Sequence, residues 1–180
     1  MPGKVPTKTL TDQRKVTYRW IAVGLMSGIL ACAAAWFFWP RLDPIAEPVD
    51  RLLLAIQCSA GIGFVALIMM QSLWRLQDTP QAEDPFANAE SQRWKINQRV
   101  YTNTLEQALI FAPIFLSLSI RMSPDDVHML PAMMSIWCIG RLLFWAGYRH
   151  SLNARVIGMD WTTVTTMLAA VWLIVTFFRG

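Results

Sequence analysis

The sequence predicts an all-α integral membrane protein, and three observations support this fold class. Of the 180 residues, 54% are hydrophobic and only 16% are charged, and the mean hydropathy is positive. The hydrophobic residues gather in five segments, each near the length of about 20 residues that crosses a hydrocarbon core. Most Lys and Arg residues fall on one side of these segments. Such a composition argues against a soluble domain.

The five expected membrane spans are residues 21–40, 52–74, 99–120, 127–148 and 156–178. Each span must be helical, because only a helix satisfies its own backbone donors and acceptors in lipid. Residues 1–20 are expected to form a basic cytoplasmic tail, and residues 75–98, with several Asp, Glu and Pro, an irregular loop. Gly24 and Gly28 in the first span, and Gly61 and Gly63 in the second, are expected to let helices approach closely.

The distribution of basic residues predicts the orientation. With a cytoplasmic amino terminus, twelve Lys and Arg residues lie on or towards the cytoplasmic side, and only Arg41, Arg51, Arg121 and Arg179 lie on the other. This follows the positive-inside rule. The sequence therefore predicts a multi-pass membrane protein, in the plasma or inner membrane if the chain is bacterial. The alternative is lipoprotein-type cleavage before Cys32, which would reverse this asymmetry.

Two function classes have little support in the sequence. The net charge of +4 is small and the basic residues form no continuous face, which argues against nucleic-acid binding. Cys32, Cys58 and Cys138 are far apart in apolar segments, and His128 and His150 have no carboxylate at ligand spacing. We therefore expect neither a disulfide framework nor a metal site.

The third span carries polar residues on one face. At about 100° per residue, Arg99, Asn103 and Glu106 fall within a narrow stripe of a helix. Charged groups at membrane depth are costly, so this stripe must face protein or water. It is a candidate functional site by default.

A second stripe follows in the fourth span, with Arg141, Trp145 and Tyr148, and it continues to Arg155. Because the third and fourth spans are antiparallel neighbours, the two stripes are expected to meet near the cytoplasmic face, with Glu106 and Arg141 at one level.

Two interpretations of the contact between the two stripes remain open. In the first, Glu106 and Arg141 form a structural ion pair, with Asn103 as an interhelical hydrogen bond. In the second, the surplus of Arg residues lines a pocket that binds a small ligand with more than one carboxylate. Asp160, at the inner end of the last span, is expected to pair with Arg155 or Arg149.

The combined motifs resemble those of the MAPEG superfamily, the membrane-associated proteins of eicosanoid and glutathione metabolism. The matching pattern is Arg99, Asn103 and Glu106 in one span, then Arg141, Gly147 and Tyr148 in the next, and Arg155 seven positions further on. The resemblance covers residues 52–180. It implies a four-helix membrane bundle assembled as a homotrimer, preceded here by one extra transmembrane helix.

The resemblance also implies roles for these residues. Glutathione, as co-substrate and without a metal, would be held by Arg99, Asn103, Glu106, Arg141 and Tyr148. Arg155 would be the catalytic residue, since a nearby guanidinium favours the nucleophilic thiolate of glutathione. The sequence departs from eicosanoid-type members at Gln107 and Phe144, where they tend to carry Tyr.

Three functional hypotheses follow. The first is a membrane-bound glutathione transferase or peroxidase that acts on a lipophilic electrophile from the bilayer. The second is a non-catalytic MAPEG-fold scaffold that binds a lipid or a partner protein, since a fold alone does not determine activity. The third is an accessory subunit or a small transporter, for which the sequence shows no inverted repeat.

Overall fold

Five long helices make up the regular structure of the described residues. The computed structural model describes residues 10–74, 89–151 and 153–179. The helices are α1 (Leu10–Phe38), α2 (Pro48–Trp74), α3 (Gln92–Arg121), α4 (Met129–His150) and α5 (Ala154–Arg179), with a short 3-10 helix, Pro124–Asp126, before α4. Each of the five is long and apolar enough to span a membrane. The chain is therefore all-helical where it is described, as an integral membrane protein requires.

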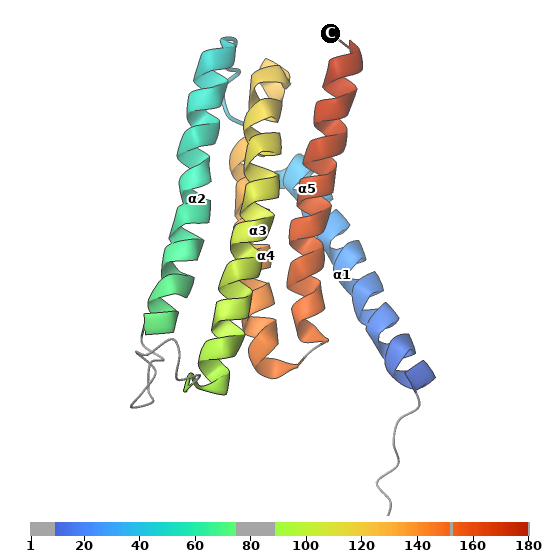
Figure 1. Cartoon of the computed structure of the whole chain (residues 1–180). Coiled ribbons are helices and arrows are strands. Elements are labelled where there is room, and N and C mark those ends of the chain that lie inside the picture. Colours follow the sequence, from blue (N-terminus) through green and yellow to red (C-terminus); the bar gives the residue numbers. More distant parts are fainter. Residues whose placement is uncertain (1–9, 75–88, 152, 180) are drawn as a thin grey trace, which may run out of the picture.

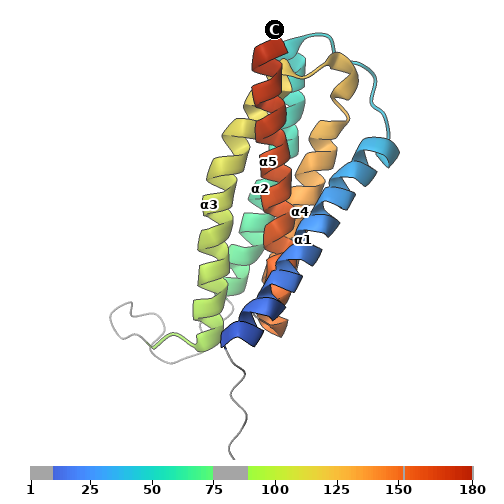
Figure 2. The ribbon, with the colours of Figure 1, turned by 90° about the vertical axis from the view of Figure 1, so that its right-hand side faces the viewer.

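The helices alternate in direction and lie side by side (Figure 1). We call the end at which α1, α3 and α5 begin and α2 and α4 end the basic end of the bundle. Helix α3 contacts α2, α4 and α5, and α4 packs closely along α5. Helix α1 crosses the bundle at an inclination and packs on α5 and α4 (Figure 2).

Aromatic side chains fill the interior between α3 and α4. Phe111, Phe115 and Trp137 are fully buried, and the rings of Phe111 and Trp137 stack with centroids 5.5 Å apart. Large apolar side chains such as Phe64 and Leu109 point outwards instead. An apolar exterior around a packed interior is the arrangement that lipid favours, because acyl chains solvate these side chains as well as protein does.

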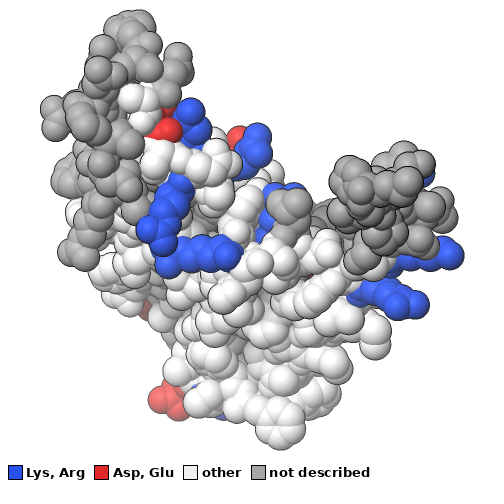
Figure 3. Space-filling view, turned by 90° about the horizontal axis from the view of Figure 1, so that it is seen from below, with Lys and Arg blue, Asp and Glu red and all other residues white. Residues whose placement is uncertain are grey.

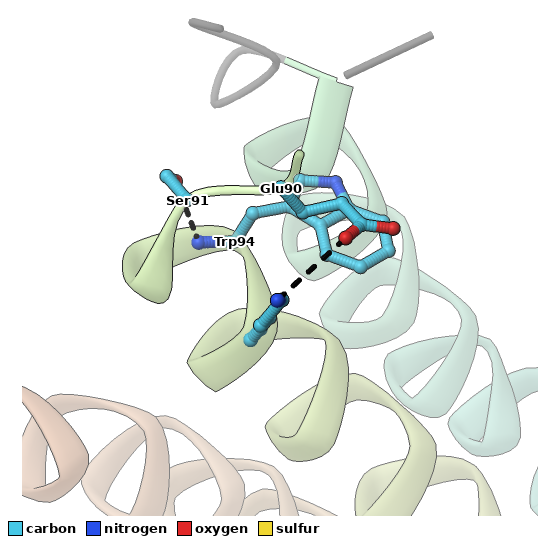
Figure 4. A network of polar contacts seen from close by, with 4 residues as sticks. Glu90, Ser91 and Trp94 are labelled. Atoms are coloured by element: carbon cyan, nitrogen blue, oxygen red, sulfur yellow. Dashed lines mark hydrogen bonds and ion pairs between the residues drawn. The ribbon is translucent and has the colours of Figure 1, made fainter. Parts of the chain in front are cut away.

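Helices α1 and α3 begin much earlier than the sequence predicts. Helix α1 begins at Leu10, so its first two or three turns extend into the segment expected to be a tail. Helix α3 begins at Gln92, so residues 92–98 are helical, contrary to the predicted loop. Here Ser91 caps α3, and its side chain accepts a hydrogen bond of 3.1 Å from the backbone N–H of Trp94 (Figure 4). Residues 75–88 of that predicted loop lie outside the described residues.

Small residues of α1 permit its close contact with α5, as predicted for Gly24 and Gly28. A Cβ at Gly28 would lie 3.4 Å from the backbone of Trp161, and one at Gly24 would lie 2.2 Å from Oδ2 of Asp160. The indole N–H of Trp161 donates to Ser27 Oγ at 2.9 Å. Of the second pair, Gly61 lies against the side chain of Cys138, but Gly63 faces open space.

Asp160 does not form the ion pair that we expected with Arg155 or Arg149. Its carboxylate faces α1 at Gly24, and its Oδ2 atom has no hydrogen-bond partner in the described part of the chain. The reason is rotational. Asp160 follows Arg155 by five positions, which turns it about 140° away around α5.

Arg51 stabilises the opposite end of the bundle. Its side chain is only 6% exposed, and it donates hydrogen bonds of 2.7–3.2 Å to the carbonyls of Ile45, Ala46, Ser119 and Ile120. It thereby ties the α1–α2 connection to the last turn of α3, whose carbonyls have no partner within the helix.

Candidate functional site

Three glycines bring α4 and α5 into backbone contact near the basic end. A Cβ at Gly158 would lie 2.1 Å from the backbone N of Phe144 and 2.5 Å from the carbonyl O of Gly140. A Cβ at Gly147 would lie 2.5 Å from the backbone of Arg155. Only glycine permits these approaches, which hold the start of α5 against the last turns of α4.

This contact brings Arg155 to Tyr148. The Arg155 guanidinium donates a hydrogen bond to the Tyr148 hydroxyl and lies over its ring, 4.6 Å from the centroid. The Tyr148 ring in turn packs edge-on against Phe144. The remaining N–H groups of Arg155 have no partner among the described residues and remain able to bind a ligand.

A pocket of about 870 Å³ opens beside this pair, between α3 and the α4–α5 contact. Its lining includes five of the six predicted site residues, which are Arg99, Asn103, Glu106, Tyr148 and Arg155. The other lining residues are Gln92, Lys95, Ile96, Gln98, Thr102, Phe144, Val156 and Met159. The first predicted stripe therefore shares one cavity with Tyr148 and Arg155 of the second stripe, at the basic end of the bundle, whereas Arg141 and Trp145 do not line it.

The charge around this pocket is mainly positive. Figure 3, seen from the basic end, shows Lys and Arg side chains gathered on this face with few Asp and Glu. Among the lining residues that the structure describes, Lys95, Arg99 and Arg155 face one carboxylate, that of Glu106. Lys95 also lies 3.8 Å from Glu90, just before α3 (Figure 4). Such a lining favours an anionic ligand that also carries an amine.

Arg141, the sixth predicted residue, does not line the pocket. It is fully buried, and its Nε and Nη2 atoms donate to Thr104 Oγ1 at 3.1 and 2.8 Å. Nη2 also donates to Asn103 Oδ1 at 3.0 Å, and the guanidinium lies 4.2 Å from the Phe144 ring centroid. Its Nη1 atom has no partner in the part of the chain that the structure describes. Arg141 therefore positions Asn103 at the pocket wall.

The expected ion pair between Glu106 and Arg141 does not form. Arg141 is buried between α3 and α4, whereas Glu106 is exposed on the pocket side of α3. The hydrogen-bond partners of Arg141 on α3 are Thr104 and Asn103, and Glu106 lies about 160° around the helix from Thr104. The rotation of α3 therefore turns Glu106 away from Arg141.

Sequence reasoning missed Thr104 and Asn97. Thr104 accepts from Arg141 and donates to the Val100 carbonyl at 2.8 Å, so its hydroxyl is fully used. Asn97 is 6% exposed and accepts a hydrogen bond of 2.7 Å from the indole N–H of Trp145. Helical periodicity places Asn97 and Thr104, seven positions apart, on one face of α3, but only the structure shows that this face packs against Arg141 and Trp145.

Comparison with known proteins decides the family. The family model described as MAPEG family matches residues 54–176, which is more than half of the chain. The chain belongs to the MAPEG family. The match begins inside α2 and ends inside α5, so α1 of this MAPEG protein lies outside it. No curated protein matches the chain.

MAPEG membership confirms the resemblance inferred from the motifs. It supports a general role in membrane-associated eicosanoid or glutathione metabolism. Among the described residues, no group of three or more His, Cys, Asp or Glu side chains lies close enough to hold a metal ion. The polar and charged side chains that line the pocket are those of Arg, Lys, Tyr, Asn, Gln, Thr and Glu residues.

Proposed function

We propose that this protein is a membrane-bound, glutathione-dependent transferase or peroxidase that uses a lipophilic electrophile or hydroperoxide. The observation that carries the proposal is the single cavity lined by Arg99, Asn103, Glu106, Tyr148 and Arg155 in a chain of the MAPEG family. Within this proposal, α2 to α5 form the four-helix unit of the family, and α1 is an addition to it.

The ligand groups of glutathione match the polar groups of the pocket. Glutathione carries two carboxylates, an ammonium group and a thiol. Arg99 and Lys95 supply cations for carboxylates, because a guanidinium can bind a carboxylate with two parallel hydrogen bonds. Glu106 supplies the anion for the ammonium group, and Asn103 supplies the amide N–H donors that Arg141 leaves free.

Arg155 is the proposed catalytic residue. A guanidinium beside the thiol stabilises the thiolate, which is the nucleophilic form. In transfer, the thiolate sulfur bonds to an electrophilic carbon, and the displaced electron pair leaves with the leaving group or takes up a proton. In peroxide reduction, two glutathione molecules supply two electrons, and the products are an alcohol, water and glutathione disulfide.

The exposed polar face of α3 supports the proposal of a homotrimer. Arg99, Thr102 and Glu106 are exposed in the single chain, although they lie in a helix that is apolar enough to span a membrane. Ionisable groups at that depth are unfavourable in lipid and face protein or a water-filled cavity. A second copy of the chain that covers this face would complete the glutathione pocket.

Glutathione titration of the purified protein, followed by thiolate absorbance, tests the proposal. We expect saturable thiolate formation in the native protein and its loss in Arg155→Ala. The matched control is Arg19→Ala, an exposed Arg of α1 that lines neither described pocket, which should behave as the native protein. Native mass measurement in detergent should show a discrete trimer.

The scaffold hypothesis gives the opposite result. If millimolar glutathione neither binds nor forms a thiolate, while the protein remains a folded trimer, the exposed polar face of α3 serves assembly alone. In that case the enzyme proposal is wrong, and a lipid- or partner-binding role takes its place.

A further inference from the structure

A second, smaller cavity lies next to the proposed glutathione pocket at the basic end. It has a volume of about 350 Å³ and is lined by Arg93, Ile96, Asn97, Tyr148 and Arg149. Ile96 and Tyr148 also line the larger pocket, so these two side chains form the wall between the cavities. The basic residues of the two cavities differ, because Arg93 and Arg149 line the small cavity and not the larger pocket.

Two guanidinium groups are the charged groups in the described lining of this cavity. Arg93 is exposed near the start of α3, and Arg149 is exposed near the end of α4. The Arg149 guanidinium lies 4.8 Å from the Trp145 ring centroid, which restricts its position. No Asp or Glu belongs to the lining that the structure describes. The two guanidinium groups therefore approach the cavity from α3 and α4, and its described wall holds no counter-charge.

Asn97 supplies an independent indication of a ligand. Its side chain is 94% buried, and its amide oxygen accepts from Trp145 Nε1 at 2.7 Å. An indole N–H can only donate, so this contact fixes which way the amide points. The amide nitrogen of Asn97 has no hydrogen-bond partner among the described residues, and Asn97 lines the cavity. This nitrogen is therefore free to donate to a ligand or a water molecule in the cavity.

We propose that this cavity binds a phosphate group, held by Arg93, Arg149 and the amide nitrogen of Asn97. A phosphate offers several acceptor oxygens and at least one negative charge, which suits two guanidinium forks and an amide. The cavity lies at the end of the membrane spans, beside Trp145 and Tyr148, which is the depth of lipid headgroups. Basic pockets between transmembrane helices are typical binding sites for anionic headgroups.

The phosphate group has two possible sources, and one experiment has an arm for each. In the first arm, the full chain is placed in nanodiscs of mixed phosphatidylglycerol and phosphatidylcholine, and the retained lipid is measured by native mass spectrometry. In the second arm, inorganic phosphate is titrated into the protein in neutral detergent. Preferential phosphatidylglycerol retention identifies a lipid headgroup, and saturable phosphate binding without lipid preference identifies a free anion. Either result supports the site.

Two variants test the assigned residues. The double variant Arg93→Gln/Arg149→Gln should lower retention or affinity by about tenfold or more, because it removes both charged contacts. Asn97→Asp keeps an acceptor for Trp145 but replaces the free donor with a negative charge, so it should also abolish binding. The control is Arg19→Gln, which removes one exposed charge from the same end of the bundle and should change binding less than twofold.

Three outcomes would overturn the phosphate site. The first is binding of neither probe by the native protein. The second is an equal loss in Arg19→Gln, which would indicate diffuse attraction by the basic end. The third is unchanged phosphate binding with weakened glutathione binding in the double variant, which would make the cavity an extension of the larger pocket. The glutathione proposal is tested separately by Arg155→Ala, because Arg155 does not line the small cavity.

Discussion

Replacing Thr104 by Val is the sharpest test of how the pocket wall is built. Valine has nearly the same shape as threonine, so the change removes the hydroxyl and leaves the packing intact. The Thr104 hydroxyl accepts two hydrogen bonds from the buried Arg141 guanidinium, at 3.1 and 2.8 Å. After the change, Arg141 keeps only its 3.0 Å bond to Asn103.

The expected loss of stability follows from these two bonds. A hydrogen bond to a charged group contributes about 1.5–3 kcal/mol, so the lower bound for two such bonds is about 3 kcal/mol. On the scale of soluble proteins of this length, that loss corresponds to a fall in Tm of roughly 6–12 °C. Glutathione affinity should fall as well. Without Thr104 to hold it, the Arg141 guanidinium fixes the Asn103 side chain less firmly at the pocket wall.

Thermal unfolding in detergent and glutathione titration measure both effects. The matched control is Thr166→Val, a buried threonine whose hydroxyl donates only to the Thr162 carbonyl of its own helix at 2.7 Å. It should cost about 1 kcal/mol or less. Equal losses in the two variants, with unchanged glutathione affinity in Thr104→Val, would refute the role assigned to Thr104.

Two further substitutions test other parts of the site. Gly158→Ala places a Cβ 2.1 Å from the backbone N of Phe144, so α4 and α5 must separate; we expect a loss of about 1–3 kcal/mol or more, together with loss of thiolate formation. Gly63→Ala, with nothing within 4 Å of the added Cβ, is its control and should leave Tm unchanged or slightly higher. Glu106→Gln should weaken glutathione binding by about tenfold, with little change in Tm, because it removes the one carboxylate among the described lining residues. Undiminished binding in this variant would show that Glu106 does not meet the ligand's ammonium group.

Much of the fold was predictable because lipid imposes simple rules on a sequence. Apolar segments of spanning length must be helices, so each of the five predicted spans falls within or largely within a helix of the structure. Helix starts were less predictable. The polar composition before residue 99 suggested a loop. The helix nevertheless starts at Gln92, because the Ser91 side chain caps it with a local hydrogen bond.

The residues of the site were predictable as a group, but their partners were not. Periodicity placed Arg99, Asn103 and Glu106 on one face, and the structure brings that face to the same cavity as Tyr148 and Arg155. Periodicity cannot say how α3 is rotated against α4. That rotation turns Thr104 towards Arg141 and Glu106 away from it, so a predicted ion pair is replaced by hydrogen bonds.

The sequence by itself determined the helical class, the number of apolar spans and the family, because hydropathy and motif spacing are properties of the chain alone. Only the tertiary structure decided that Arg141 is buried without a carboxylate partner in the described part of the chain, and that Asp160 faces α1. It also decided that Asn97 presents a free amide to a second cavity. The physical reason is that a hydrogen bond requires two groups to meet within about 3 Å, and that distance depends on how helices rotate and approach one another.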